Sequence, residues 1–175
     1  MKLFLFPTLS CLAALSLFSV APSRAADEKG KEPALSDTEQ KYLQGVVSAN
    51  LGEIAMSYLA IEKSASNDVK SYALDVIDEH TKTMKKILEI ASRHNAFLAL
   101  EPDLSAYNNL LKPGGEEFDK AYLAESQRMN QEATSKLEPL TSQINAADVK
   151  SFAQSDLKDD QEHIKKAQDL AGKLK

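Results

Sequence analysis

Four stretches of this sequence repeat apolar residues at steps of three and four, which is the spacing of one face of an α-helix. The first two extend over about residues 37–64 and 67–95, and the other two begin near residues 116 and 146. Helices of about 28 residues are about 40 Å long. No segment shows the alternation of a strand. We therefore predict an all-α protein built as a four-helix bundle.

Capping residues indicate where the helices begin. Ser36 is followed three residues later by Glu39, which is the pattern of a capping box. Asn67 is a candidate cap for the second helix, and Asn145 with Asp148 resembles a further cap before the last one. These side chains can accept the free backbone N–H groups of a first helical turn.

The segment between the second and third helices is rich in helix breakers. Residues 96–115 contain two prolines and two glycines, so we predict a connection there. A short extra helix from Leu104 to Leu111, capped by Asp103, is expected inside it. Pro139 is expected to kink or end the third helix. Twenty residues are enough to cross a bundle when extended, so the relative direction of helices 2 and 3 stays open.

The N-terminal residues have the composition of an export signal. A short basic start at Met1–Lys2 precedes an apolar run from Leu3 to Val20, and small residues precede a cut ahead of Ala26. We predict a signal peptide over residues 1–25, a flexible charged leader over 26–36 and the bundle domain over 37–175. The expected location is the periplasm or the cell envelope, with no integral membrane segment in the mature chain.

Charge and cysteine content exclude several classes of function. The predicted cleavage removes Lys2 and Arg24, leaving 19 of the 21 basic residues against 26 acidic ones and changing the net charge from -5 to -7. Nucleic acid is therefore excluded as a partner, because binding phosphates needs a concentrated basic face. The single cysteine, Cys11, is also lost, so disulfides, thiolate metal sites and a cysteine nucleophile are excluded. Serine-hydrolase, zinc-protease and phosphate-loop motifs are absent from the sequence.

Two helices begin with nearly the same six residues. DVKSYA at positions 68–73 matches DVKSFA at 148–153, which lies 80 residues further on, and each precedes a helix with a histidine on its apolar side. The match is short, but its two copies occupy equivalent places. It favours a duplicated helical hairpin.

Each predicted helix carries a titratable residue on or beside its apolar face, where such residues are uncommon. Carboxylates and imidazoles from several helices build metal sites inside bundles, and Asp160 followed by His163 has the required spacing. The residue three before His80 is Ile77, so a complete di-iron set is missing. One divalent ion, such as iron or zinc, remains possible with N and O ligands. The candidate metal ligands are Glu53, His80, Glu125, Asp160 and His163.

Two alternatives stand beside this metal site. The first is structural: His80 is a core histidine satisfied by Glu53 or Asp160, and the polar network fixes the helix register. We prefer it, because a sequence shows no coordination geometry. The second is copper, since His80 and Met84 lie one turn apart and a thioether with an imidazole suits that metal. Methionines in helices, however, commonly fill gaps in the core.

An ordered series of motifs gives a family resemblance. ANLGEI at 49–54, EHT at 79–81, EFDKAY at 117–122 and EH at 162–163 resemble the exported bacterial domain-of-unknown-function 4142 family, over about Lys41 to Leu170. The resemblance implies a ferritin-like bundle in the periplasm or envelope, with Glu53, His80 and His163 at matching positions. Members are often labelled outer membrane proteins, but no activity comes with the family. Where the family has an Asp-His pair on the third helix, this chain has Met129–Asn130, which weakens a four-helix metal centre.

Three functions are compatible with these features. The first is a non-catalytic binding or stress-related protein of the cell envelope. The second is a metal-binding ferritin-like protein or oxidase that uses the inward residues as ligands. The third is an interaction module whose outer surfaces bind an envelope protein or a second copy of the chain. Reaction, substrate and cofactor do not follow from the sequence.

Overall fold

The computed structural model describes residues 32–174. The predicted signal peptide and most of the leader lie outside the described residues. Four long helices form the fold, and their bounds are α1 (Asp37–Lys63), α2 (Asn67–Arg93), α4 (Gly115–Leu137) and α5 (Ala147–Ala171). A short helix α3 (Ser105–Asn109) lies between α2 and α4, and a 3₁₀ segment η2 (Glu138–Gln143) follows α4. The predicted all-α bundle with a short extra helix is confirmed.

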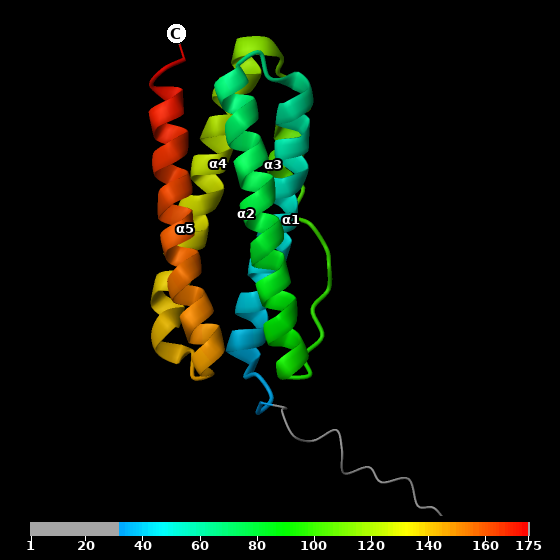
Figure 1. The fold of residues 1–175 in the computed structure, drawn as a ribbon, viewed down its shortest axis with the longest axis vertical. Helices are drawn as coiled ribbons and strands as arrows, with labels where there is room; N and C mark the ends of the chain where they lie inside the picture. Colours follow the sequence, from blue (N-terminus) through cyan, green and yellow to red (C-terminus); the bar gives the residue numbers. More distant parts are fainter. Residues whose placement is uncertain (1–31, 175) are drawn as a thin grey trace, which may run out of the picture. The chain divides into compact units, whose positions relative to one another are not determined.

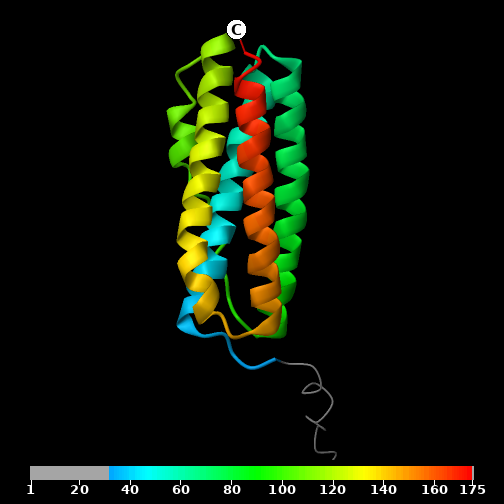
Figure 2. The same ribbon diagram turned by 90° about the vertical axis from the view of Figure 1, so that its left-hand side faces the viewer.

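The helices pack as two antiparallel pairs, α1 with α2 and α4 with α5 (Figure 1). The chain leaves α2 at one end of the bundle and returns along the outside of α1 before α4 begins at the other end (Figures 1 and 2). Helices α2 and α4 therefore run in the same direction. A single long crossover between two helical hairpins is the connectivity of ferritin-like bundles.

The crossover segment, residues 95–104, is held against α1 by backbone and side-chain hydrogen bonds. The Gln44 amide exchanges two hydrogen bonds of 2.8 Å with the backbone of Ala99, and Asp103 N donates to Ser48 O at 2.9 Å. Gly52 is essential to this contact, because a Cβ at this position would overlap the Asp103 carbonyl oxygen. The glycine in α1 thus marks the place where the connection approaches the helix.

The helix caps agree only in part with the sequence. The capping box of Ser36 and Glu39 is present, and Pro139 lies at the start of η2, where α4 ends. The cap of α2 is Ser66, so the prediction of Asn67 was wrong by one residue. Asn145 does not cap α5: the carboxylate of Glu39 accepts the backbone N–H groups of Asn145 and Ala146, each at 2.8 Å. The start of α1 therefore holds the two residues that lead into α5.

The core has two apolar clusters, one toward each end of the bundle. One contains Phe118, Tyr122 and residues from the second half of α1, and the other contains Leu43, Ile87 and Phe152. The middle of each long helix contributes polar side chains instead. Within residues 32–174, no helix is both long and apolar enough to cross a membrane.

The repeated hexapeptides occupy equivalent positions in the two hairpins. Each begins the second helix of its pair, and Val69 and Val149 are both fully buried. The same offset of 80 residues places His80 of α2 in correspondence with Asp160 of α5. A common origin of the two hairpins stays a prediction.

Candidate functional site

A cluster of buried polar side chains lies between the two apolar ends. Every long helix contributes at least one member, and all are at least nine-tenths buried. Burying such groups is costly unless partners replace the lost water. The cluster, called here the polar core, consists of Asn50, Glu53, His80, Asn130, Asp156, Asp160 and His163.

Glu53 joins three helices of the polar core. Its Oε2 lies 3.4 Å from His80 Nε2 of α2 and accepts a hydrogen bond of 3.0 Å from Asn130 Nδ2 of α4. The expected pair of His80 with Glu53 is therefore present, at the distance of an ion pair rather than of a well-aligned hydrogen bond. Asn130 lies where the family resemblance implies a histidine. Its side-chain amide donates to Glu53, the carboxylate that a histidine at this position would face.

The two histidines stack on each other with ring centroids 5.2 Å apart. Burial opposes the charge of His80, but the Glu53 carboxylate outweighs burial and raises the pKa of His80 above its ordinary value. Burial and the nearby positive charge of His80 lower the pKa of His163. His163 Nε2 lies 3.0 Å from Glu79 Oε2, which is partly exposed. These surroundings therefore favour the charged form of His80 and the neutral form of His163.

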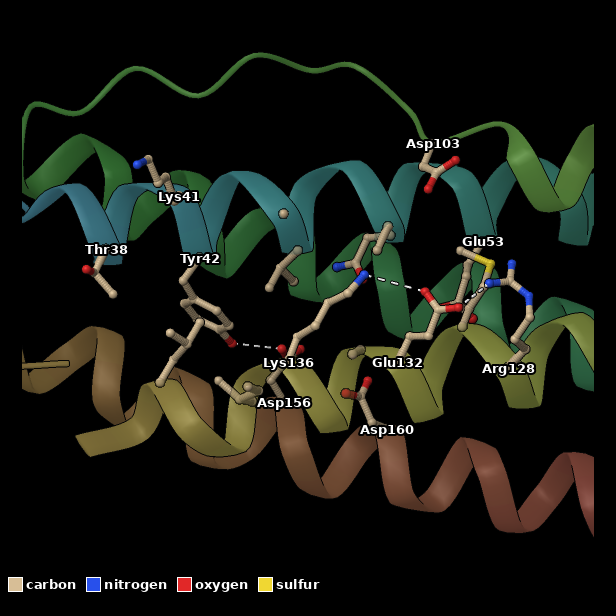
Figure 3. A pocket seen from close by; sticks show the side chains of 18 of the residues that line it. Thr38, Lys41, Tyr42, Glu53, Asp103, Arg128, Glu132, Lys136, Asp156 and Asp160 are labelled. Atoms are coloured by element: carbon tan, nitrogen blue, oxygen red, sulfur yellow. Dashed lines mark hydrogen bonds and ion pairs between the residues drawn. The ribbon is translucent and has the colours of Figure 1, made fainter. Parts of the chain in front are cut away.

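A pocket of about 440 Å³ opens between α1, α4 and α5 and reaches the polar core (Figure 3). Its apolar lining includes Val46, Ala49, Met129, Leu137 and Leu140. Its polar lining at the deep end consists of Tyr42, Asn50, Glu53, Asp156 and Asp160. This size and this mixture of apolar walls with a few polar groups are typical of small-molecule sites.

The two aspartates at the deep end have different surroundings. Asp156 Oδ2 accepts a hydrogen bond of 2.8 Å from the Tyr42 hydroxyl, as the dashed line in Figure 3 shows. Burial raises the pKa of Asp156 to about 6. Asp160 Oδ2 has no hydrogen-bond partner among the described residues. Burial, followed by the negative charges of Asp156 and Glu53, raises the pKa of Asp160 to about 8.

The charged residues of α4 near the pocket mouth neutralise one another. Arg128 contacts Glu132 at 2.6 Å and Lys136 lies 3.4 Å from Glu132 (Figure 3). Arg128 also contacts Glu125 at 2.8 Å. These pairs are at least partly exposed, so each contributes little to stability. Asp160 at the deep end differs from them, because its Oδ2 has no hydrogen-bond partner in the described residues.

The structure brings four of the five predicted site residues together. Glu53, His80, Asp160 and His163 belong to the polar core, whereas Glu125 does not. Glu125 accepts hydrogen bonds from Arg128 and from Asn109 of α3 at the surface of α4. The sequence pattern placed Glu125 on the apolar face of its helix, but in the structure it lies at the edge of that face.

Some members of the site were missed. Asn50 and Asp156 could be found in the sequence as polar residues on apolar helix faces. Their neighbours Tyr42 and Asn130 could not, because both are uncharged and fit an ordinary core position. No group of three or more His, Asp or Glu side chains within residues 32–174 is placed to hold a metal ion. The metal site, copper included, stays a prediction.

His94 forms a separate contact at the other end of α2. It is the C-cap of that helix, and its ring lies 2.5 Å from Pro33 O and 3.0 Å from Asp148 Oδ1. Burial opposes the charge of this ring, but its two partners raise the pKa of His94 above its ordinary value. The contact ties the segment before α1 to the start of α5.

The fold and the site together define a class: a ferritin-like four-helix bundle with a polar core and a side pocket. The chain belongs to the family described as Domain of unknown function (DUF4142), whose model matches residues 24–170. A comparison with curated proteins found no match. The chain is similar in structure to a DUF305 fragment from Deinococcus radiodurans, with a TM-score of 0.73 and 17% identity, covering 81% of this chain and 100% of that one. At this identity the likeness concerns the fold alone.

Proposed function

We propose that this chain is an exported, non-catalytic binding protein of the cell envelope, and that the pocket between α1, α4 and α5 is its binding site. One observation carries the proposal: the pocket ends at Asp160, a buried carboxyl whose Oδ2 has no partner within residues 32–174. The sequence features of a signal peptide support the location.

A purely structural network would leave fewer groups unsatisfied. Buried polar atoms in folded proteins nearly always have hydrogen-bond partners, and each exception needs an explanation. Here Asp160 Oδ2 and Asn50 Nδ2 both lack partners in the described part of the chain, and both residues line the same pocket. A ligand in the pocket that bonds to these atoms would offset their desolvation.

Binding in the pocket can be tested with three probes that share a phenyl ring and differ in charge. These are phenethylamine, 2-phenylethanol and 3-phenylpropanoate, each titrated into ¹⁵N-labelled protein and followed by NMR. At least one is expected to shift the amide signals of pocket residues such as Ala49 and Met129. Failure of all three probes to shift pocket signals would contradict the proposal.

A pocket-filling variant provides the matched control. Ala133 lines the pocket, whereas Ala124 is an exposed residue of the same helix. Ala133→Phe is expected to abolish the probe-induced shifts, and Ala124→Phe is expected to leave them unchanged. Equal binding by both variants would place the probes elsewhere on the protein.

The location has its own test. The full chain expressed in a Gram-negative host is expected in the periplasmic fraction, with an N-terminus at Ala26 by mass spectrometry. A chain that lacks residues 2–25 is the control and is expected in the cytoplasmic fraction. Full-length, uncleaved protein confined to the cytoplasm would refute export.

A further inference from the structure

The charges around the pocket indicate which ligand it binds. We propose that the pocket takes a small organic cation, with an ammonium group against Asp160 and an apolar body along the pocket walls. This inference rests on the proposed function and adds the chemical class of the ligand.

Two unpartnered side chains identify the place for the ammonium group. Asp160 is 8% exposed and Asn50 is 4% exposed, and each has a polar atom with no hydrogen-bond partner in the described residues. Figure 3 shows Asp160 on α5, directed into the space that α1 and α4 also border. An ammonium group has donors to give to a carboxylate oxygen. The Asn50 amide can turn about its last bond, which exchanges its nitrogen and oxygen and lets the oxygen accept as well.

The charge balance at the deep end favours a cation. Glu53 is paired with His80 at 3.4 Å, and its carboxylate favours the charged form of that imidazole. Asp156 has the Tyr42 hydroxyl as a neutral donor. Asp160 has neither, and its like-charged neighbours are Asp156 and Asp159 on its own helix and Glu53 on α1. An ionised Asp160 therefore requires a positive charge from the ligand, and an anionic ligand would be repelled.

The pocket mouth does not supply that positive charge. Arg128 and Lys136 are engaged by Glu132, and Arg128 also by Glu125. Because the guanidinium of Arg128 is paired with two carboxylates at once, it is held in place and is not directed at another group. Lys41, the third basic residue of the lining, is exposed and its side chain points away from Asp160 (Figure 3), so none of the three is placed to compensate this carboxylate.

The walls favour an organic body over a bare metal ion. A bound divalent ion needs several converging protein ligands, and the described residues offer no group of three. A single ammonium needs one carboxylate and a few acceptors. The remaining walls, which include Val46, Met129 and Leu137, can bury a hydrocarbon group and contribute through the hydrophobic effect.

Isothermal titration calorimetry with the full-length protein tests the inference. At pH 7, phenethylamine is expected to bind at least tenfold more tightly than 2-phenylethanol and 3-phenylpropanoate. Asp160→Asn is expected to weaken the binding of phenethylamine at least tenfold. Asp169→Asn, an exposed acid of the same helix with the same change of charge, is expected to alter affinity less than twofold.

The possible outcomes separate the inference from the proposed function. If 2-phenylethanol or 3-phenylpropanoate binds as tightly as the amine, and Ala133→Phe blocks it, the pocket is a binding site but not one for cations. Equal affinity of the Asp160→Asn variant and the parent protein for phenethylamine overturns the inference in the same way. If none of the three probes binds, the proposed function and the inference both fail.

Discussion

Gly52 of α1 lies directly beneath the backbone carbonyl of Asp103, at the point where the crossover segment returns along the bundle. The residue next to Gly52 is Glu53, the centre of the polar core. The same turn of α1 therefore faces the crossover on one side and the site on the other. A change in the fit of the crossover is transmitted to the helix that positions the site.

Gly52→Ala is expected to destabilise the protein by about 1 to 3 kcal/mol, because its Cβ has no space beside Asp103. Gly45→Ala on the same helix is the control. Its Cβ meets nothing within 4 Å, so this change is expected to stabilise by about 0.5 to 1 kcal/mol. Urea unfolding followed by circular dichroism measures both. If both substitutions change the free energy of unfolding equally, the close contact between Gly52 and Asp103 is contradicted.

Glu39→Gln is expected to lower the free energy of unfolding by about 1 to 2 kcal/mol at pH 7, because its carboxylate accepts backbone N–H groups at the starts of both α1 and α5. Burial opposes ionisation, but these hydrogen bonds lower the pKa of Glu39 to about 2. Its contribution is present above the unfolded pKa near 4.5 and is lost as the pH falls toward 2.

Urea unfolding at pH 7 and at pH 2.5 checks this dependence. The difference between Glu39→Gln and the parent protein is expected to shrink at the lower pH. Asp37→Asn, an exposed acid in the same helical turn, is the control and is expected to cost less than about 1 kcal/mol. A pH-independent loss in Glu39→Gln would show that its charge does not carry the effect.

The helices were predictable because their signals are local. Steps of three and four, the Ser36 box and Pro139 each depend on residues within one or two turns. The contact that holds the residues before α5 was not predictable, since its acceptor, Glu39, lies about a hundred residues earlier in the chain. The direction of α4 was open for a similar reason: only the packing of the crossover against Gln44 and Gly52 decides it.

The residues of the candidate site were likewise predictable only where the signal is local in the sequence. Charged residues on apolar stripes indicated Glu53, His80, Asp160 and His163, because such residues seldom lie inward without a role. Glu125 lies at the edge of its stripe, where Arg128 one turn away draws it to the surface. The pocket itself was not predictable, because it depends on how three helices pack and on the small side chains between them.

Opposite titration of the stacked histidines is a further prediction. NMR titration of ¹³C- and ¹⁵N-labelled histidine is expected to give His80 a pKa above 6.5 and His163 one below it, because two charged rings cannot be stable 5.2 Å apart in a buried site. Glu53→Gln is expected to lower the pKa of His80 by removing its counter-charge. A higher pKa for His163 than for His80 would reverse the assignment. His94→Gln serves to assign the third signal.

The last prediction concerns the stability cost of the unpaired carboxyl. Asp160 has a folded pKa of about 8 against an ordinary value of 3.8, so it must lose its proton inside the protein as the pH rises. A raised pKa contributes stability below the unfolded value, and this contribution is lost as the pH rises through about 8. The wild-type protein is therefore expected to become less stable between pH 4 and pH 8.

Asp160→Asn replaces this carboxyl by a neutral group of the same shape. Its free energy of unfolding is expected to be close to that of the parent protein at pH 4.5 and about 2 to 4 kcal/mol higher at pH 8. Urea unfolding at pH 4.5, 6.5 and 8.0, without added amines, measures this difference, and Asp169→Asn, at an exposed acid of the same helix, is expected to show none of it. An Asp160→Asn variant that is less stable than the parent at pH 8 would mean that the carboxylate has a partner in the free protein. That result would remove the physical basis for a ligand cation at this position, because the buried charge would already be compensated.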